Sequence, residues 1–293
     1  MPVSSPSLAG RVALVTGANT GIGFVTAREL AARGMHVFLA CRSEGSGRDA
    51  LAAIRAVVPQ AQVDLLALDL GDFASVRFCA KDFLARKLPL HVLVNNAGLA
   101  GGKGLTRSGF ELAFGTNHLG HFLLTQLLLD NIRATAQMSG GARIVTVASR
   151  AHKRVQGIDF PAVQQPTQTV TGLREYGVSK LANVLFNAEL GRRLKGTGVS
   201  TYALHPGVVA TDVWRAVPWP FRWFIKRGMI DAEAGARTTL HCAMAEGIEG
   251  QTGLYWDKCE PKAPQGAGQD IALAAELWRR SEAWVQESQP EAP

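Results

Sequence analysis

The chain has 293 residues, of which 47% are hydrophobic and 19% are charged, and its formal net charge is +7. This apolar content supplies a sizeable core and excludes an intrinsically disordered chain. The basic residues are spread along the sequence and form no Lys/Arg run with interleaved aromatic residues, so the composition does not indicate a nucleic-acid-binding protein.

Strand-like and helix-like segments alternate along the chain. The predicted strands, which are short apolar runs rich in β-formers, are Val12–Thr16, Val37–Ala40, Val63–Leu68, Val92–Val94, Ile144–Val147, Val199–Leu204 and Leu254–Trp256. The predicted helices are Ile22–Arg33, Arg48–Val57, Phe73–Arg86, Phe110–Asp130, Tyr176–Leu194 and Ala232–Ala245. Several strands are apolar at every position, which is typical of strands covered on both faces. The alternation predicts an α/β protein with a Rossmann-type doubly wound parallel sheet of about seven strands.

One domain accounts for most of the chain. We expect residues 10–284 to form a single domain between a flexible N-terminus at 1–9 and a flexible tail at 285–293. Two segments inside the domain differ from the rest. Residues 150–175 are polar and rich in Pro, Gln and Thr, which predicts a loop insertion, whereas residues 213–230 concentrate aromatic residues, prolines and bases.

The cysteines form no CxxC pair and no spacing suited to zinc or to a disulfide framework; they are Cys41, Cys79, Cys242 and Cys259. The N-terminal residues lack a basic region followed by an apolar core, and no run reaches the ~18 apolar residues that a membrane span needs. We therefore expect a cytoplasmic protein with no metal site and no transmembrane span.

A glycine-rich stretch follows the first predicted strand and leads into the first helix. Its residues are Thr16-Gly17-Ala18-Asn19-Thr20-Gly21-Ile22-Gly23. Glycines at this point allow a tight turn and close backbone approach to a pyrophosphate, and the helix N-terminus offers N–H groups and a positive dipole end. The stretch predicts a dinucleotide site. The alternative is that the glycines serve only the packing of helix on strand.

The Gly-x-x-x-Gly-x-Gly spacing, with motifs at the ends of later strands, closely resembles the short-chain dehydrogenase/reductase family. Asp69-Leu70 resembles the adenine-contacting aspartate of the family, and Asn95-Asn96-Ala97-Gly98 resembles its NNAG segment. The resemblance spans roughly residues 10–260. The cofactor contacts that it implies in this half of the chain are Gly17, Asn19, Thr20, Gly21, Ile22, Gly23, Asp69, Leu70, Asn96, Ala97 and Gly98.

The end of the second predicted strand is where the choice of cofactor is expected to be encoded. In this fold an Asp or Glu about 20 residues after the glycines binds a ribose 2′-hydroxyl. This sequence has Leu39-Ala40-Cys41-Arg42-Ser43 instead. An arginine with no acid beside it can pair with a 2′-phosphate, so Arg42 and Ser43 predict NADP(H). The alternative is that Arg42 is an ordinary surface cation.

Tyr176 and Lys180 lie four residues apart in a predicted helix, so their side chains share one face. A lysine beside a tyrosine favours the phenolate and brings proton transfer closer to neutral pH. The pair therefore indicates general acid/base chemistry, with a solvated surface pair as the alternative. The family resemblance implies that Tyr176 is the acid/base and that both residues bind the cofactor, Lys180 through the nicotinamide ribose hydroxyls.

In the family, a serine near the end of the fifth strand positions the substrate oxygen, and the matching residue here is Ser149. Ser149 and Tyr176 are 27 positions apart, a longer gap than is usual in the family, because the polar insertion lies between them. A loop can leave and return to the same rim without moving the strand end or the helix start. Ser149 is therefore a predicted catalytic residue.

Asn117 lies inside the helix predicted at Phe110–Asp130, where asparagine is a poor helix former. Its family counterpart helps to hold a water that joins the lysine to solvent, so the resemblance implies a catalytic role. A buried asparagine that caps a kink is the alternative. We expect the neighbouring His118 and His121 to be packing or hydrogen-bonded residues rather than catalytic ones.

A Pro-Gly pair follows the sixth predicted strand and resembles the family segment whose following residues contact the nicotinamide amide. The resemblance implies cofactor contacts from Pro206, Gly207, Val209 and Thr211, with Thr211 as the candidate for the amide contact. Pro206 and Gly207 also make an adequate turn without any ligand.

The resemblance implies interconversion of a carbonyl and an alcohol with NADP(H), in which Tyr176 transfers the proton and Ser149 hydrogen-bonds the developing oxyanion. A non-catalytic NADP-binding sensor is the alternative from another class. The intact set of Asn117, Ser149, Tyr176 and Lys180 argues against a sensor, which has no need of proton transfer. Family members are often dimers or tetramers, and the sequence leaves a homo-oligomer open.

A substrate lid is predicted within residues 213–230, from Trp214, Trp219, Phe221, Trp223 and Phe224. Aromatic and basic residues suit a cover over an apolar substrate or contact with a membrane surface, and a packing or dimer role is the alternative. The long insertion and the Leu-Ala-Cys-Arg strand end most resemble the retinol dehydrogenase branch, which acts on lipophilic aldehydes and alcohols such as retinal and retinol. A steroid or xenobiotic carbonyl reductase is the alternative.

Overall fold

An eight-stranded β-sheet forms the centre of the structure, a computed structural model that describes residues 8–207 and 231–287. The strand order is β3-β2-β1-β4-β5-β6-β7-β8, and among the described residues all neighbours run parallel except β7 and β8. The strands are β1 (Val12–Thr16), β2 (His36–Cys41), β3 (Val63–Ala67), β4 (Val92–Asn95), β5 (Ala142–Val147), β6 (Val199–His205), β7 (Leu254–Asp257) and β8 (Glu260–Lys262). The predicted parallel sheet is confirmed, and β8 is an addition to it.

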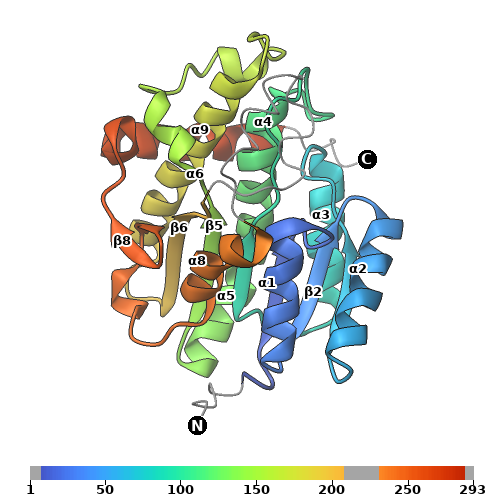
Figure 1. The fold of residues 1–293 in the computed structure, drawn as a ribbon. Coiled ribbons are helices and arrows are strands. Elements are labelled where there is room, and N and C mark those ends of the chain that lie inside the picture. Colours follow the sequence, from blue (N-terminus) through green and yellow to red (C-terminus); the bar gives the residue numbers. More distant parts are fainter. Residues whose placement is uncertain (1–7, 208–230, 288–293) are drawn as a thin grey trace.

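Helices cover both faces of the sheet (Figure 1). One face is covered by α1 (Gly21–Ala32), α2 (Glu44–Val57) and α8 (Ala232–Met244). The other face is covered by α3 (Phe73–Ala85), α5 (Gly120–Ser139), α6 (Leu173–Arg193) and α9 (Ile271–Glu287). The shorter helices are α4 (Leu112–Phe114), the π-helix η1 (Gly115–Leu119) and the 3₁₀ helices η2 (Arg150–Arg154), η3 (Ala162–Gln164), η5 (Glu249–Gln251) and η6 (Gly266–Gln269).

The central strands divide their side chains between two apolar layers. On β1, Leu14 packs in the layer beneath α3, α5 and α6, whereas Val15 packs in the layer beneath α1 and α8. Both side chains are fully buried, as is expected when successive residues of a strand point to opposite faces that are both covered. This double burial explains why the central strands are largely apolar and why the sequence identifies them.

The helix predicted at Phe110–Asp130 contains a π-helical turn in the structure. The short helix α4 and the π-helix η1 precede α5, which begins at Gly120. A Cβ added to Gly120 would lie 2.3 Å from the carbonyl oxygen of Leu70, so the helix approaches the loop after β3 too closely for a side chain. The backbone is helical without a break from Leu112 to Ser139, so the predicted helix is confirmed, with a π-helical turn at Gly115–Leu119 that the prediction did not include.

The polar insertion predicted at residues 150–175 is folded against the body of the protein. It contains η2 and η3, and its last residues form the first turn of α6. Glu111 is 3% exposed and accepts a hydrogen bond from the Thr167 hydroxyl at 2.5 Å. Glu175 accepts a second bond, from the backbone N–H of Thr169 at 2.9 Å. These bonds return the insertion to the rim from which it leaves.

The ends of the domain extend further than predicted. Val285 is 5% exposed in α9, so residues 285–287 belong to a packed helix rather than to a flexible tail. At the other end Leu8, within the predicted flexible stretch 1–9, donates its N–H to the carbonyl of Arg33 at 2.9 Å. Tertiary contacts hold both segments, and local sequence patterns do not reveal such contacts.

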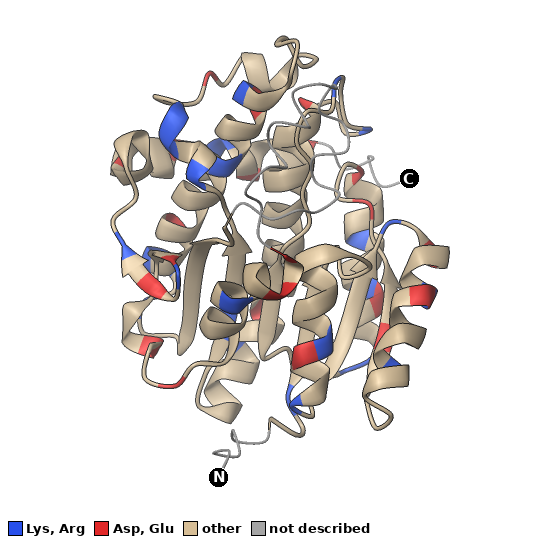
Figure 2. Ribbon diagram, in the orientation of Figure 1, with Lys and Arg blue, Asp and Glu red and all other residues tan. Residues whose placement is uncertain are grey.

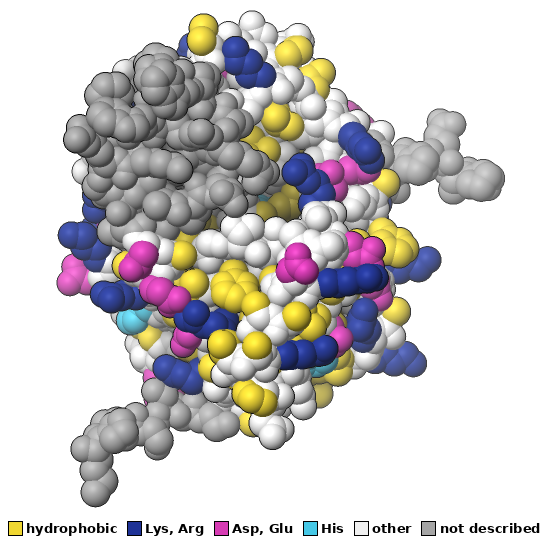
Figure 3. All heavy atoms as spheres, turned by 45° about the vertical axis from the view of Figure 1, so that its right-hand side comes forward, with side chains coloured by type: hydrophobic (Ala, Val, Ile, Leu, Met, Phe, Trp, Pro, Cys, Tyr) yellow, Lys and Arg dark blue, Asp and Glu magenta, His cyan; other side chains and the backbone are white. Residues whose placement is uncertain are grey.

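Charged residues are distributed over the described surface. Basic and acidic residues occur on most elements of the ribbon, and on the face in Figure 3 they alternate with small apolar groups (Figures 2 and 3). Within residues 8–207 and 231–287, no helix is long and apolar enough to cross a bilayer.

Candidate active site

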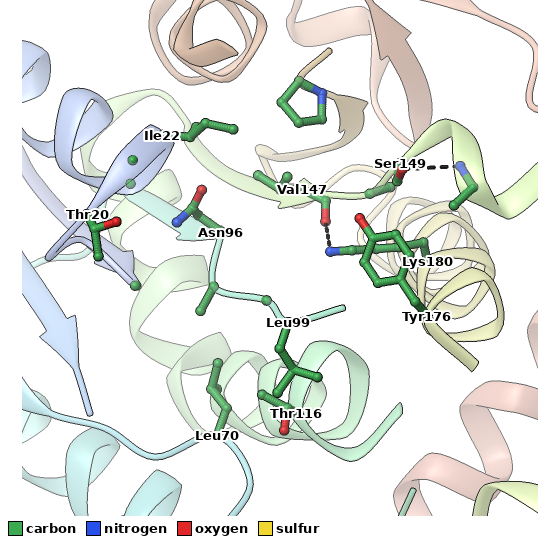
Figure 4. A pocket seen from close by; sticks show the side chains of 18 of the residues that line it. Thr20, Ile22, Leu70, Asn96, Leu99, Thr116, Val147, Ser149, Tyr176 and Lys180 are labelled. Atoms are coloured by element: carbon green, nitrogen blue, oxygen red, sulfur yellow. Dashed lines mark hydrogen bonds between the residues drawn. The ribbon is translucent and has the colours of Figure 1, made fainter. Parts of the chain in front are cut away.

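A cleft of about 470 Å³ lies along the carboxyl ends of the parallel strands. Its centre is the point where β1 lies between β2 and β4 and the strand order changes direction, which is where open α/β sheets bind ligands. Thr20, Ile22 and Asn96 lie toward one end, and Ser149, Tyr176 and Lys180 lie at the other (Figure 4). The predicted cofactor contacts that line it are Gly17, Asn19, Thr20, Gly21, Ile22, Gly23, Arg42, Ser43, Asp69, Leu70, Asn96, Ala97, Gly98, Tyr176, Lys180, Pro206 and Gly207.

The glycine-rich turn after β1 forms one end of the cleft. Gly17 and Gly21 have φ angles of +63° and +57°, which side-chain-bearing residues rarely adopt. Thr20 is the N-cap residue of α1 but makes no side-chain capping bond to the helix. Gly21, Ile22 and Gly23, the first residues of α1, line the cleft, so the positive end of the helix dipole lies at the cleft, an arrangement that suits the pyrophosphate of a dinucleotide.

Arg42 and Ser43 extend this end of the cleft beyond β2. Among the described residues, no acidic side chain forms an ion pair with Arg42. The nearest acid in sequence, Glu44, pairs with Arg48 at 2.5 Å. The guanidinium of Arg42 is therefore available to a ligand phosphate.

Asp69 lies on the wall after β3, where its carboxylate accepts the N–H of Gly71 at 2.9 Å. This bond shapes the turn after β3 at this side of the cleft. Pro206 and Gly207 line the cleft at the end of β6, and Gly207 has a φ of +95°. The other residues predicted to contact the cofactor or to form the lid at 213–230 lie outside the described residues: Val209, Thr211, Trp214, Trp219, Phe221, Trp223 and Phe224.

Tyr176 and Ser149 lie together at the other end of the cleft (Figure 4), close enough for the serine side chain to lower the pKa of the tyrosine. Ser149 also caps η2 by accepting the N–H of Ala151 at 3.1 Å. The ammonium of Lys180 donates to the carbonyl oxygen of Val147 at 2.8 Å (Figure 4). The insertion between Ser149 and Tyr176 therefore leaves the serine–tyrosine contact in place.

Burial controls the acid/base properties of this pair. It raises the pKa of Tyr176 above its usual range, an effect that the hydrogen bond with Ser149 opposes. It lowers the pKa of Lys180 to about 7. The expectation that Lys180 lowers the tyrosine pKa does not hold in this structure. Its Nζ lies 5.8 Å from the centre of the Tyr176 ring, and a lysine of such low pKa carries only part of its charge near neutrality.

Asn117 lies behind the wall of the cleft and does not line it. Its Oδ1 accepts the N–H of Leu99 at 2.9 Å, and its Nδ2 donates to the carbonyl of Leu99 and to the hydroxyl of Ser179, each at 3.0 Å. With these bonds the amide fastens the loop after β4 to α6. The side chain of Asn117 is therefore in a positioning role, and its predicted contact with a water stays a prediction.

Several groups at the site have no counterpart in the sequence prediction. Leu99, Leu173 and His205 line the cleft, and the carbonyl of Val147 receives Lys180. A backbone carbonyl carries no sequence signal. Leu173 lies one turn before Tyr176 on α6, which is the one signal that would have indicated its position. The predicted packing roles of His118 and His121 are confirmed, since both are buried and hydrogen-bonded.

The sheet order and the helix N-terminus at its switch point define a dinucleotide-binding α/β protein, to which the serine, tyrosine and lysine add a proton-transfer site. A family model described as short chain dehydrogenase matches residues 11–219. The chain belongs to this family, and it is an oxidoreductase of alcohol and carbonyl groups that uses a nicotinamide cofactor.

Similar proteins include human retinol dehydrogenase 12, which is 44% identical over 281 residues, covering 94% of this chain and 86% of that protein. Human dehydrogenase/reductase SDR family member 13 is 43% identical over 287 residues, covering 94% and 73%. An uncharacterised protein from Mycobacterium paratuberculosis has a similar crystal structure, with 34% identity, a TM-score of 0.78 and coverage of 97% and 96%. Actinorhodin polyketide ketoreductase with NADPH gives 26% identity, a TM-score of 0.65 and coverage of 85% and 96%.

Proposed function

We propose that the protein is an NADP(H)-dependent oxidoreductase that interconverts a lipophilic aldehyde and its alcohol, such as retinal and retinol. The observation that carries the proposal is that one cleft holds Arg42 at one end and Ser149, Tyr176 and Lys180 at the other. The similarity to human retinol dehydrogenase 12 over 94% of the chain supports the class of substrate.

The residues of the cleft divide the reaction between them. The nicotinamide, when bound, supplies or accepts the hydride. Tyr176 gives its hydroxyl proton to the substrate oxygen during reduction and takes it back during oxidation. Ser149, which lies beside Tyr176 in the cleft, donates to the same oxygen as negative charge develops. Lys180, held by Val147, keeps an ammonium group at the base of the site when protonated.

Arg42 carries the proposed preference for NADP(H). A guanidinium with no acidic partner among the described residues offers paired N–H donors to a 2′-phosphate, whereas a carboxylate at this point would repel it. Ser43, which caps α2, adds a hydroxyl at the same edge.

Tyr176→Phe tests the reaction. We expect turnover of retinal with NADPH to fall by at least about 100-fold, because the proton donor is lost while the ring remains. NADPH affinity, measured by fluorescence titration, should change little. Retention of the wild-type kcat would refute the role of Tyr176.

An absence of turnover by the wild type on retinal, other aldehydes, steroids and xenobiotic ketones would favour a sensor, and turnover of ketones alone would favour a carbonyl reductase.

Arg42→Ala tests the cofactor. The variant should bind NADPH about tenfold or more weakly, since one charge-assisted pairing is lost, with NADH affinity nearly unchanged. Arg48→Ala is the matched control, because it removes the same charge from an exposed position on α2 outside the cleft. Equal losses of NADPH affinity in the two variants would contradict a specific phosphate contact.

The predicted cytoplasmic location, membrane contact and oligomeric state stay predictions.

A further inference from the structure

A buried hydroxyl on β1 organises the loop after β4. The Oγ1 of Thr16 accepts the backbone N–H of Asn96 at 2.9 Å and that of Ala97 at 3.0 Å, and both of those residues line the cleft. The same Oγ1 lies 2.9 Å from Nε2 of His121 and 3.4 Å from the carbonyl oxygen of Val94. Because the two backbone donors occupy both lone pairs of the hydroxyl, its one proton points elsewhere, and the imidazole nitrogen is the closer acceptor.

This geometry determines which ring nitrogen of His121 carries the hydrogen. Its Nε2 accepts from Thr16, so its Nδ1 carries the hydrogen and donates to the carbonyl oxygen of Asn117 at 3.0 Å. The opposite tautomer would direct a third donor at the Thr16 oxygen and would place the Nδ1 lone pair against a carbonyl oxygen. A charged ring would also bring a third donor to Thr16. Burial lowers the pKa of His121 to about 4, in keeping with a neutral ring.

The hydrogen bonds continue from Asn117 to the catalytic helix. Asn117 Nδ2 donates to the hydroxyl of Ser179 at 3.0 Å, and that hydroxyl donates to the carbonyl oxygen of Tyr176 at 2.8 Å. Thr16, Asn117 and Ser179 are fully buried and His121 is 1% exposed. We call Thr16, His121, Asn117, Ser179 and Tyr176 the Thr16–Tyr176 network. It runs beneath the cleft from the cofactor-side loops to the backbone of the tyrosine.

We propose that His121 is a positioning residue which, as a neutral Nδ1–H imidazole, joins the cofactor-binding loops after β1 and β4 to the helix that carries Tyr176. The inference rests on the proposed function for its effect on turnover. The network couples the two ends of the cleft, so that removing the imidazole changes both the affinity for the cofactor and the placement of the proton donor.

His118 provides a matched control. It lies three positions before His121, is equally buried at 1%, and also makes a side-chain hydrogen bond, in which its Nε2 lies 3.0 Å from the hydroxyl of Ser281 on α9. That bond leads away from the cleft. Replacing either histidine with leucine removes a buried ring and a hydrogen bond, and only His121→Leu breaks the Thr16–Tyr176 network.

We expect His121→Leu to weaken NADPH binding and to lower kcat, each by about tenfold or more, because two buried hydrogen bonds are lost at once. His118→Leu should lose a similar amount of thermal stability and keep both constants within about twofold. His121→Gln retains an acceptor and a donor, so it should keep part of the NADPH affinity and part of the kcat that His121→Leu loses. Equal kinetic effects from the two leucine variants would overturn the proposal, and so would the absence of any effect on NADPH affinity in His121→Leu.

A second measurement reads the tautomer in the wild-type protein and does not depend on turnover. In protein labelled with ¹⁵N-histidine, two-bond ¹H–¹⁵N spectra distinguish the two neutral tautomers and the cation for each of the seven histidines. His121, assigned with His121→Gln, should show the Nδ1–H form at pH 7, with and without NADPH. The Nε2–H form or the cation would refute the inference, even if the enzyme proves to act on another substrate.

Discussion

At the scale of single residues, Lys180 has chemistry that is set by burial. The side chain is 3% exposed and its ammonium donates to the carbonyl of Val147. Desolvation lowers the pKa of Lys180 to about 7, well below its value in an unfolded chain. Between these two values the unfolded chain binds one more proton than the folded chain. Folding stability therefore rises with pH above about 7, as the cost of burying a charge is removed.

Lys180→Met should reveal this dependence of folding stability on pH. Methionine has no charge to bury, so the variant should have a higher unfolding free energy than the wild type. We expect this difference to be largest at pH 6 and to become progressively smaller toward pH 9. The difference in unfolding free energy should shrink by roughly 1.4 kcal/mol per pH unit above pH 7. Urea unfolding of cofactor-free protein measures it. The exposed Lys153→Met controls for the change in net charge, and a difference independent of pH would show that Lys180 is not buried as a perturbed cation.

At the scale of elements, the first helix and the first strand approach each other closely enough to exclude a side chain. A Cβ added to Gly23 would lie 2.3 Å from the carbonyl oxygen of Gly17 and 2.5 Å from Nδ2 of Asn96. Asn96 itself donates to the carbonyl of Thr16 at 2.8 Å. The glycine therefore sets the position of the N-terminus of α1 at the cleft.

Gly23→Ala should lower the unfolding free energy by about 1–3 kcal/mol, because the added methyl group has to displace backbone atoms. It should also weaken NADPH binding by moving the helix N-terminus. Gly45→Ala is the control, since this glycine is in the first turn of α2 with no atom within 4 Å of the added Cβ. That variant should be unchanged or slightly stabilised. A Gly23→Ala protein with wild-type stability would contradict the close approach.

An element can be predicted from the sequence when residues close together in the chain determine it, and less well when distant residues do. The strand Val12–Thr16 is apolar at every position but the last and is found with the predicted bounds. The segment Gly115–Leu119 has helical neighbours on both sides, but its π-helical form depends on contacts with the loops after β3 and β4. Poor helix formers at this point indicate a departure from regular helix, and they do not specify which departure occurs.

At the scale of the whole molecule, α9 closes one face of the core. Trp278 stacks on Phe186 with ring centres 5.8 Å apart, and Trp284 packs edge-on against Phe114 at 6.1 Å. The helix spans Ile271–Glu287 and is absent from the sequence prediction. Its apolar face is stabilised by α5 and α6, which precede it by many residues, so its place in the fold is a property of the assembled core.

The sequence by itself determined the parallel sheet, the glycine-rich turn and the pairing of Tyr176 with Lys180, because each depends on apolar runs or on residues close together in the chain. The tertiary structure decided that Ser149 meets Tyr176 across the insertion and that Asn117 lies behind the cleft. It also decided the direction of the tyrosine pKa, since desolvation depends on what surrounds a group. The burial that sets these properties comes from segments far apart in sequence.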